Sequence, residues 1–352
     1  MKKKVILLLF LLVVITIYQG CNRDEVVNPN LPGRTDIEGV YVLSEGGFAS
    51  GTAKLSYYSI KKDTFFLNIF NPGNLGLFPD GLIVKDNYLF ITEQGSYGNA
   101  GTIYKTDTNG TVLMSNQVGL NPYSIAYSND KLYITNGPAG NVSVVNKNTL
   151  AQIKTIQAGV FPQEILSFNN YVFVCNTSMF FGNKDSTVSV IDSRTDQEIT
   201  KLSVKRDPSA LAITNDLKLL VGCNDSIGCI YVFDPVNLIK VDSFYNLPGG
   251  FGRDICVDKN SSDIYYIANN NNIMRLNLST RTVTVFITNP NPSSVFYYGY
   301  AYDYKNKRHY VADARNFTVT GLLRIFDNAG NPIKVYDTGI APRRIVLKLR
   351  EE

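Results

Sequence analysis

Carboxylates are the first side chains in this chain that could do chemistry, because Asp and Glu act as general acids or bases and bind calcium. Several fall in or near predicted loops, among them Asp80, Glu93, Asp207 and Asp313. They come from separate segments and have basic neighbours such as Arg206 and Arg315. Charge pairing explains them more simply than a shared ion, so the sequence predicts no metal centre.

Nucleophilic and redox chemistry find equally little support. His309 is the only histidine in 352 residues, and one imidazole cannot build a multi-histidine metal site. It begins the segment HYVAD, where other copies of a repeat have an aromatic or apolar residue, which predicts a structural role. No nucleophile, base and orienting residue form a recognisable set. We therefore expect a non-enzymatic protein without a cofactor.

A unit of about forty residues recurs along the chain and would position the loops. Equivalent residues before a predicted first strand are Pro79, Pro122, Pro162, Pro208, Gly252, Tyr298 and Pro342. Their spacings are 43, 40, 46, 44, 46 and 44 residues. Each unit reads as four short strands with period-2 alternation, as in NVSVVNK at 141–147. The sequence predicts an all-β, seven-bladed β-propeller with four-stranded antiparallel blades.

The two ends of the repeat region are incomplete in complementary ways. Residues 341–349, APRRIVLKL, predict a first strand with nothing after it, and residues 39–47, GVYVLSEGG, match a second strand with no first strand before it. We expect the C-terminal strand to complete the N-terminal blade and close the ring. Closure of this kind removes exposed sheet edges.

In a propeller, the loops from fourth to first strands and from second to third strands gather on one face around the central channel. We call this the loop face. Here these loops are rich in aromatic residues, which on a rigid scaffold favour a recognition surface. Packing between blades is an alternative for Tyr123. The predicted ligand-binding residues are Phe48, Asp80, Glu93, Tyr97, Tyr123, Gln163, Phe180, Ser209, Arg253, Tyr297, Tyr298, Arg315, Phe317 and Arg343.

The N-terminus has the features of an export signal. MKKK is followed by an apolar run over residues 5–18 and by Gly20 and Cys21, as in a bacterial lipoprotein signal peptide. The prediction is a signal peptide at 1–20, a lipidated Cys21 with a flexible tether over 21–36, and the propeller over 37–352. An ordinary signal peptide or an uncleaved anchor is the alternative.

Charge and cysteine content narrow the possible partners and chemistry. The formal net charge is +4, and without the three lysines of the leader it is about +1, which argues against nucleic acid as a partner. Cys223 and Cys229 bracket a five-residue turn between two predicted strands. They form either a disulfide or two small buried residues. For Cys175 and Cys256 we predict the second role.

Two resemblances extend this interpretation. The strings LYITN at 132–136 and GNVSVV at 140–145 resemble the repeat of YVTN/YncE-like propellers, a superfamily of mixed function. With the leader and the acidic tetrapeptide NRDE at 22–25, the chain resembles the BtuG-type surface lipoproteins. That resemblance implies binding of cobalamin (vitamin B12) at the loop face and its transfer to a BtuB-like TonB-dependent transporter in the outer membrane. An envelope scaffold that binds a protein or glycan is the alternative.

Overall fold

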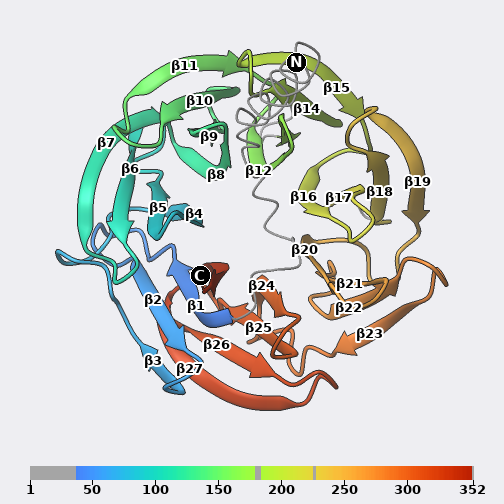
Figure 1. Ribbon diagram of the computed structural model, residues 1–352. Coiled ribbons are helices and arrows are strands. Elements are labelled where there is room, and N and C mark those ends of the chain that lie inside the picture. Colours follow the sequence, from blue (N-terminus) through green and yellow to red (C-terminus); the bar gives the residue numbers. More distant parts are fainter. Residues whose placement is uncertain (1–36, 179–183, 225–226, 351–352) are drawn as a thin grey trace, which may run out of the picture. The chain divides into compact units, whose positions relative to one another are not determined.

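The computed structural model describes residues 37–178, 184–224 and 227–350. Within these ranges the chain forms seven four-stranded antiparallel sheets arranged as blades of a ring (Figure 1). The same ranges contain no helix that is long and apolar enough to cross a membrane. The predicted signal peptide, Cys21, the tether and Phe180 lie outside the described residues. The predicted seven-bladed β-propeller is confirmed.

The blades follow one another in the sequence, and each runs from an inner to an outer strand (Figure 1). Blade 1 contains β28 (Pro342–Leu349), β1 (Ile37–Ser44), β2 (Lys54–Ser59) and β3 (Thr64–Phe66). Blade 2 contains β4 (Pro79–Lys85), β5 (Tyr88–Glu93), β6 (Ala100–Asp107) and β7 (Val112–Leu120). Blade 3 contains β8 (Pro122–Ser128), β9 (Lys131–Asn136), β10 (Asn141–Asn146) and β11 (Gln152–Gln157).

The remaining four blades repeat this order. Blade 4 contains β12 (Pro162–Phe168), β13 (Tyr171–Asn176), β14 (Thr187–Asp192) and β15 (Gln197–Ser203). Blade 5 contains β16 (Pro208–Ile213), β17 (Leu219–Cys223), β18 (Cys229–Asp234) and β19 (Ile239–Tyr245). Blade 6 contains β20 (Arg253–Val257), β21 (Asp263–Ile267), β22 (Ile273–Asn277) and β23 (Val283–Ile287). Blade 7 contains β24 (Tyr297–Asp303), β25 (Arg308–Asp313), β26 (Thr320–Phe326) and β27 (Pro332–Ile340).

The hydrophobic core lies in layers between neighbouring blades, because side chains alternate across each strand. In β9, Leu132 and Ile134 pack with Phe90 of blade 2, whereas Tyr133 between them packs with Val172 of blade 4. Outer strands such as β11 face solvent over most of their length. Alternate residues of one strand therefore contact the two neighbouring blades, one on each side.

The last strand closes the ring. In blade 1, β28 pairs antiparallel with β1, and the register places Ile345 opposite Val42 and Leu347 opposite Val40. Both valines are fully buried. The C-terminal strand thus completes the N-terminal blade as predicted, and the first and last described strands hold each other in place.

Candidate functional site

The inner strands begin at the loop face with an irregular turn of backbone. Strand pairing shifts register between Pro79 and Leu82, and the equivalent shift occurs at the start of β8 and β12. Bulges of this kind re-aim side chains. Several residues at these starts, together with residues of β28, direct their side chains at one another across the channel, as their hydrogen bonds show.

Five of these side chains form a charged floor across the channel. Arg343 donates hydrogen bonds to Glu164 at 2.9 Å and to Asp254 at 3.1 Å. Arg344 donates to Glu164 at 2.9 Å and to Asp80 at 2.8 Å. Because these residues belong to blades 1, 2, 4 and 6, their side chains link opposite walls of the ring. At this level the channel is crossed by ion pairs.

Burial makes the charged floor electrostatically strong. Asp80 is fully buried and Arg343 is 3% exposed, so water screens these charges little. Burial opposes ionisation of Glu164, but Arg344 and Arg343 outweigh it and lower the pKa of its carboxyl. Oδ2 of Asp80 and Nε of Arg343 are buried without a hydrogen-bond partner among the described residues. The charges of the floor are thus paired, but two of its polar atoms can still accept or donate a hydrogen bond.

An aromatic patch, Phe296, Tyr298 and Phe317, lies beside the charged floor. The ring centroid of Phe317 is 5.0 Å from that of Tyr298 and 5.2 Å from that of Phe296. The guanidinium carbon of Arg253 lies 4.7 Å from the Tyr298 centroid, and that of Arg343 lies 5.4 Å away. Phe317 is 38% exposed, so the patch reaches solvent.

Glu45 connects the patch to the first blade. The hydroxyl of Tyr298 donates a hydrogen bond of 3.0 Å to Oε1 of Glu45. Burial and the nearby negative charge of Asp80 raise the pKa of Glu45 to about 7, against the opposing effects of Tyr298 and Arg343. This carboxyl therefore changes its charge near neutral pH while in hydrogen-bond contact with one ring of the aromatic patch.

Further aromatic side chains project from loops of blades 1 and 2. Phe48 is 92% exposed and its ring centroid lies 5.8 Å from that of Phe78, while Tyr97 is 71% exposed. Rings exposed to this extent gain little from the fold itself. They remain available for contact with a ligand or partner.

Two predicted residues follow the proline that begins inner strands β8 and β12. Tyr123 is half-buried, and burial followed by the charge of Asp80 raises the pKa of its phenol well above the usual value. Gln163 is also half-buried, and its backbone carbonyl accepts a hydrogen bond of 2.7 Å from Thr135. Tyr123 therefore lies next to the charged floor, whereas the contact shown for Gln163 is made by its backbone.

Four other predicted residues have structural partners. Glu93 accepts hydrogen bonds from the backbone of Gly76 and from Tyr104, which fixes the loop before β4. Ser209 donates to the carbonyl of Gly252 at 3.1 Å and so links blades 5 and 6. Arg315 is exposed and donates to the carbonyl of Thr320. The structure places Tyr297, 1% exposed, in the core between blades 6 and 7, which removes its ring from the loop face.

The thiols and the histidine lie in the interior. Cys223 and Cys229 are directly opposite in the β17–β18 register without a disulfide between them. A hydrogen bond with Cys229 and burial raise the pKa of the Cys223 thiol. His309 is fully buried in β25, as its predicted structural role requires. Among the described residues, no three His, Cys, Asp or Glu side chains gather closely enough to hold a metal ion.

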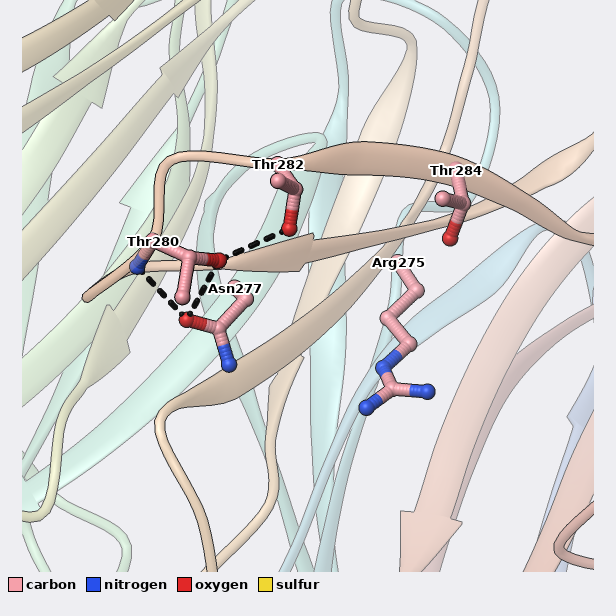
Figure 2. A pocket seen from close by; sticks show the side chains of 5 residues that line it. All are labelled: Arg275, Asn277, Thr280, Thr282 and Thr284. Atoms are coloured by element: carbon pink, nitrogen blue, oxygen red, sulfur yellow. Dashed lines mark hydrogen bonds between the residues drawn. The ribbon is translucent and has the colours of Figure 1, made fainter.

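A polar hollow of about 300 Å³ lies on the rim of blade 6 (Figure 2). It is lined by Arg275, Asn277, Thr280, Thr282 and Thr284. Thr280 donates from its backbone to Asn277, and Arg275 forms an ion pair with Asp263. The first contact lies in the turn between β22 and β23 and the second joins β22 to β21, so the hollow is formed by polar groups that are paired within blade 6.

Sequence reasoning missed Glu45, Glu164, Asp254, Phe296 and Arg344. Three of them directly follow a predicted residue, as in the pairs Gln163-Glu164, Arg253-Asp254 and Arg343-Arg344. A search for adjacent polar residues at the start of each inner strand would have found them, because a bulge there directs two successive side chains toward the channel.

Comparisons with known proteins are informative only about the fold. No family model matches the chain, and no curated protein sequence matches it. A quinoprotein alcohol dehydrogenase-like protein from Bacteroides thetaiotaomicron is similar in structure, with a TM-score of 0.67, 12% identity, and coverage of 88% of this chain and 78% of that one.

Two further solved structures are similar. Hydrazine synthase from Kuenenia stuttgartiensis has a TM-score of 0.62 at 17% identity, covering 75% of this chain and 87% of that one. The dihydro-heme d1 dehydrogenase NirN has a TM-score of 0.54 at 12% identity, covering 91% and 78%. The chain shares the propeller scaffold of these proteins. At such identities a shared scaffold does not transfer activity.

Proposed function

We propose that this chain is a non-enzymatic protein that binds cobalamin or a related corrinoid at the loop face. The observation that carries the proposal is the aromatic patch of Phe296, Tyr298 and Phe317, with Arg253 stacked on it, beside a channel crossed by the charged floor. A corrinoid is a large flat ring edged with amides. Aromatic rings suit its flat surface, and the surrounding polar groups suit its edge.

The closed channel favours capture at the surface over passage through the ring. Arg343 reaches across the channel to blades 4 and 6, and Arg344 reaches to blades 4 and 2. A large ligand would therefore rest above these two side chains. Opposite charges hold the carboxylates of the floor in ion pairs. Groups engaged in this way suit binding and orientation better than proton transfer, which supports a role without catalysis.

The predicted leader adds a location to the proposal. A lipidated Cys21 would anchor the propeller to the outer membrane, with its loop face able to meet a TonB-dependent transporter that receives the ligand. NirN, which shares the fold, is a dihydro-heme d1 dehydrogenase, so a propeller of this kind is compatible with a tetrapyrrole ligand. The proposed sequence of events is capture at the cell surface followed by transfer to the transporter.

Calorimetric titration of the chain beginning at residue 22 with cyanocobalamin tests the proposal. We expect saturable one-to-one binding at micromolar ligand, and at least tenfold weaker binding for Tyr298→Ala, which should still form a cooperatively unfolding ring. Tyr245→Ala removes an exposed tyrosine from outer strand β19 and serves as the matched control. Absence of any heat change would overturn the proposal. Copurification of an envelope protein, with no response to corrinoid, would favour the scaffold alternative.

A further inference from the structure

We call the region where the aromatic patch meets the charged floor the channel mouth. Arg253 differs from the other two arginines of this region, Arg343 and Arg344. Arg343 and Arg344 are both engaged in ion pairs, whereas the side chain of Arg253 makes no hydrogen bond or ion pair with another described residue. It is half-buried and stacks on Tyr298 and Phe296, with its guanidinium carbon 4.7 Å and 5.6 Å from their ring centroids. Stacking orients the guanidinium, and its N–H donors remain open to a ligand.

The charges around Arg253 decide which acceptor fits. Four carboxylates, those of Glu45, Asp80, Glu164 and Asp254, share this region with the guanidinium groups of Arg253, Arg343 and Arg344. With every group ionised, the negative charges exceed the positive ones by one. Protonation of Glu45, whose pKa is raised to about 7 by burial and by Asp80, brings the cluster only to neutrality.

Arg253 thus has open donors in a region with no surplus of positive charge. An incoming carboxylate would gain a hydrogen bond from Arg253 but would be repelled by the negative charge of Asp80, and by that of Glu45 when it is ionised, in a partly buried setting. A neutral carbonyl oxygen accepts the same hydrogen bond without that repulsion. The apolar part of such a group would rest against the rings of Tyr298 and Phe317.

We propose that the channel mouth is a subsite for a neutral carboxamide, in which Arg253 donates to the carbonyl oxygen, and that it rejects the corresponding carboxylate. This subsite rests on the proposed function and makes it more specific. The amide edge of the ligand is what the channel mouth selects, and a single hydrolysed side chain at that edge is enough to weaken binding.

Binding of cyanocobalamin is compared with binding of its derivatives in which one side-chain carboxamide has been hydrolysed to a carboxylate, each titrated separately. We expect at least one derivative to bind the wild-type chain tenfold more weakly than the parent. Arg253→Ala should weaken binding of cyanocobalamin about tenfold and reduce its advantage over that derivative to less than threefold. Arg281→Ala removes a cation from the same blade, paired with Asp242 on an outer strand, and should keep the full preference.

The outcomes separate the two proposals. If neither cyanocobalamin nor any derivative binds, the proposed function is wrong and the subsite with it. If all of them bind within twofold of one another, corrinoid binding stands and the carboxamide subsite is overturned. A tenfold preference that survives in Arg253→Ala would also overturn it, because the discrimination would then come from other residues.

Discussion

The guanidinium of Arg343, on the last strand of the chain, donates a hydrogen bond of 2.9 Å to the carboxylate of Glu164 on the inner strand of blade 4. The same guanidinium also reaches Asp254 in blade 6. Strand β28 therefore closes the ring in two ways, through its backbone pairing with β1 and through its side chains across the channel. Stability and the floor of the candidate site depend on the same strand.

Removal of the Arg343 side chain should destabilise the whole ring. In Arg343→Ala, Glu164 keeps one partner, Arg344, and Asp254 loses its ion pair. We expect the free energy of unfolding to fall by about 3 kcal/mol, which is usual when one partner of a buried ion pair is removed. Arg281→Ala, which breaks the exposed pair with Asp242, should cost under about 1 kcal/mol. Urea unfolding of both variants tests this. Equal losses would show that the floor contributes no more than a surface pair.

Truncation of the chain should open the ring. A chain ending at residue 340 lacks β28, so the edge of β1 that pairs with β28 becomes exposed. Exposed strand edges promote aggregation. We expect soluble aggregates or no soluble protein by size-exclusion chromatography, whereas a chain ending at residue 350 should elute as the intact protein does. A monomeric, cooperatively unfolding product from the shorter chain would contradict closure by β28.

The fold was predictable because its signals are local and repeated. Strand alternation and turn residues recur in every unit, and five of the seven inner strands begin at the proline identified from the repeat, as at Pro122 and Pro162. Closure of the ring was predictable because the C-terminal segment has only a first strand and the N-terminal unit has no first strand. Strand alternation and turn residues involve only residues that are close in the sequence, so they can be recognised in a single sequence.

The candidate site was predictable only in part because its contacts are distant in sequence. Tyr297 and Tyr298 are adjacent aromatics, yet one enters the core and the other reaches the channel. Which of them does so depends on the register shift at the start of β24. Glu164 and Arg343 meet only after the ring closes, since 179 residues separate them. Pairing over such a span leaves no periodic trace in the sequence.

His309 should make the protein sensitive to acid. Its ring stacks on Tyr302 at 4.3 Å, Nδ1 lies 2.6 Å from the Tyr300 hydroxyl, and burial lowers its pKa to about 3. In the unfolded chain the His309 imidazole becomes protonated near pH 6.5, whereas in the folded chain it stays neutral at that pH. Stability therefore falls as pH decreases from 6.5 toward 3, by at most about 1.4 kcal/mol per pH unit from this group.

Comparison with His309→Phe isolates that contribution. The variant keeps an aromatic ring against Tyr302 but leaves the Tyr300 hydroxyl without its partner, so we expect lower stability at pH 7.5 by about 1–3 kcal/mol. The deficit should shrink as the pH is lowered to 5, because only the wild type pays for a neutral histidine. Urea unfolding at several pH values measures the difference. A deficit that stays constant with pH would exclude His309 as the source.

Glu45 should produce the opposite dependence. Because burial and Asp80 raise its pKa to about 7, the folded chain keeps a proton that the unfolded chain loses near pH 4.5. The stability from this group is complete below pH 4.5 and is lost as pH rises through 7. Glu45→Gln stays neutral, so its stability relative to wild type should rise between pH 5 and 8 in thermal unfolding. In Glu38→Gln the difference should be constant over this range, since Lys348 and Arg350 outweigh burial and lower the pKa of Glu38. A constant difference for Glu45→Gln as well would mean that Glu45 is ionised throughout, and the charge balance at the channel mouth would then be negative at every pH tested.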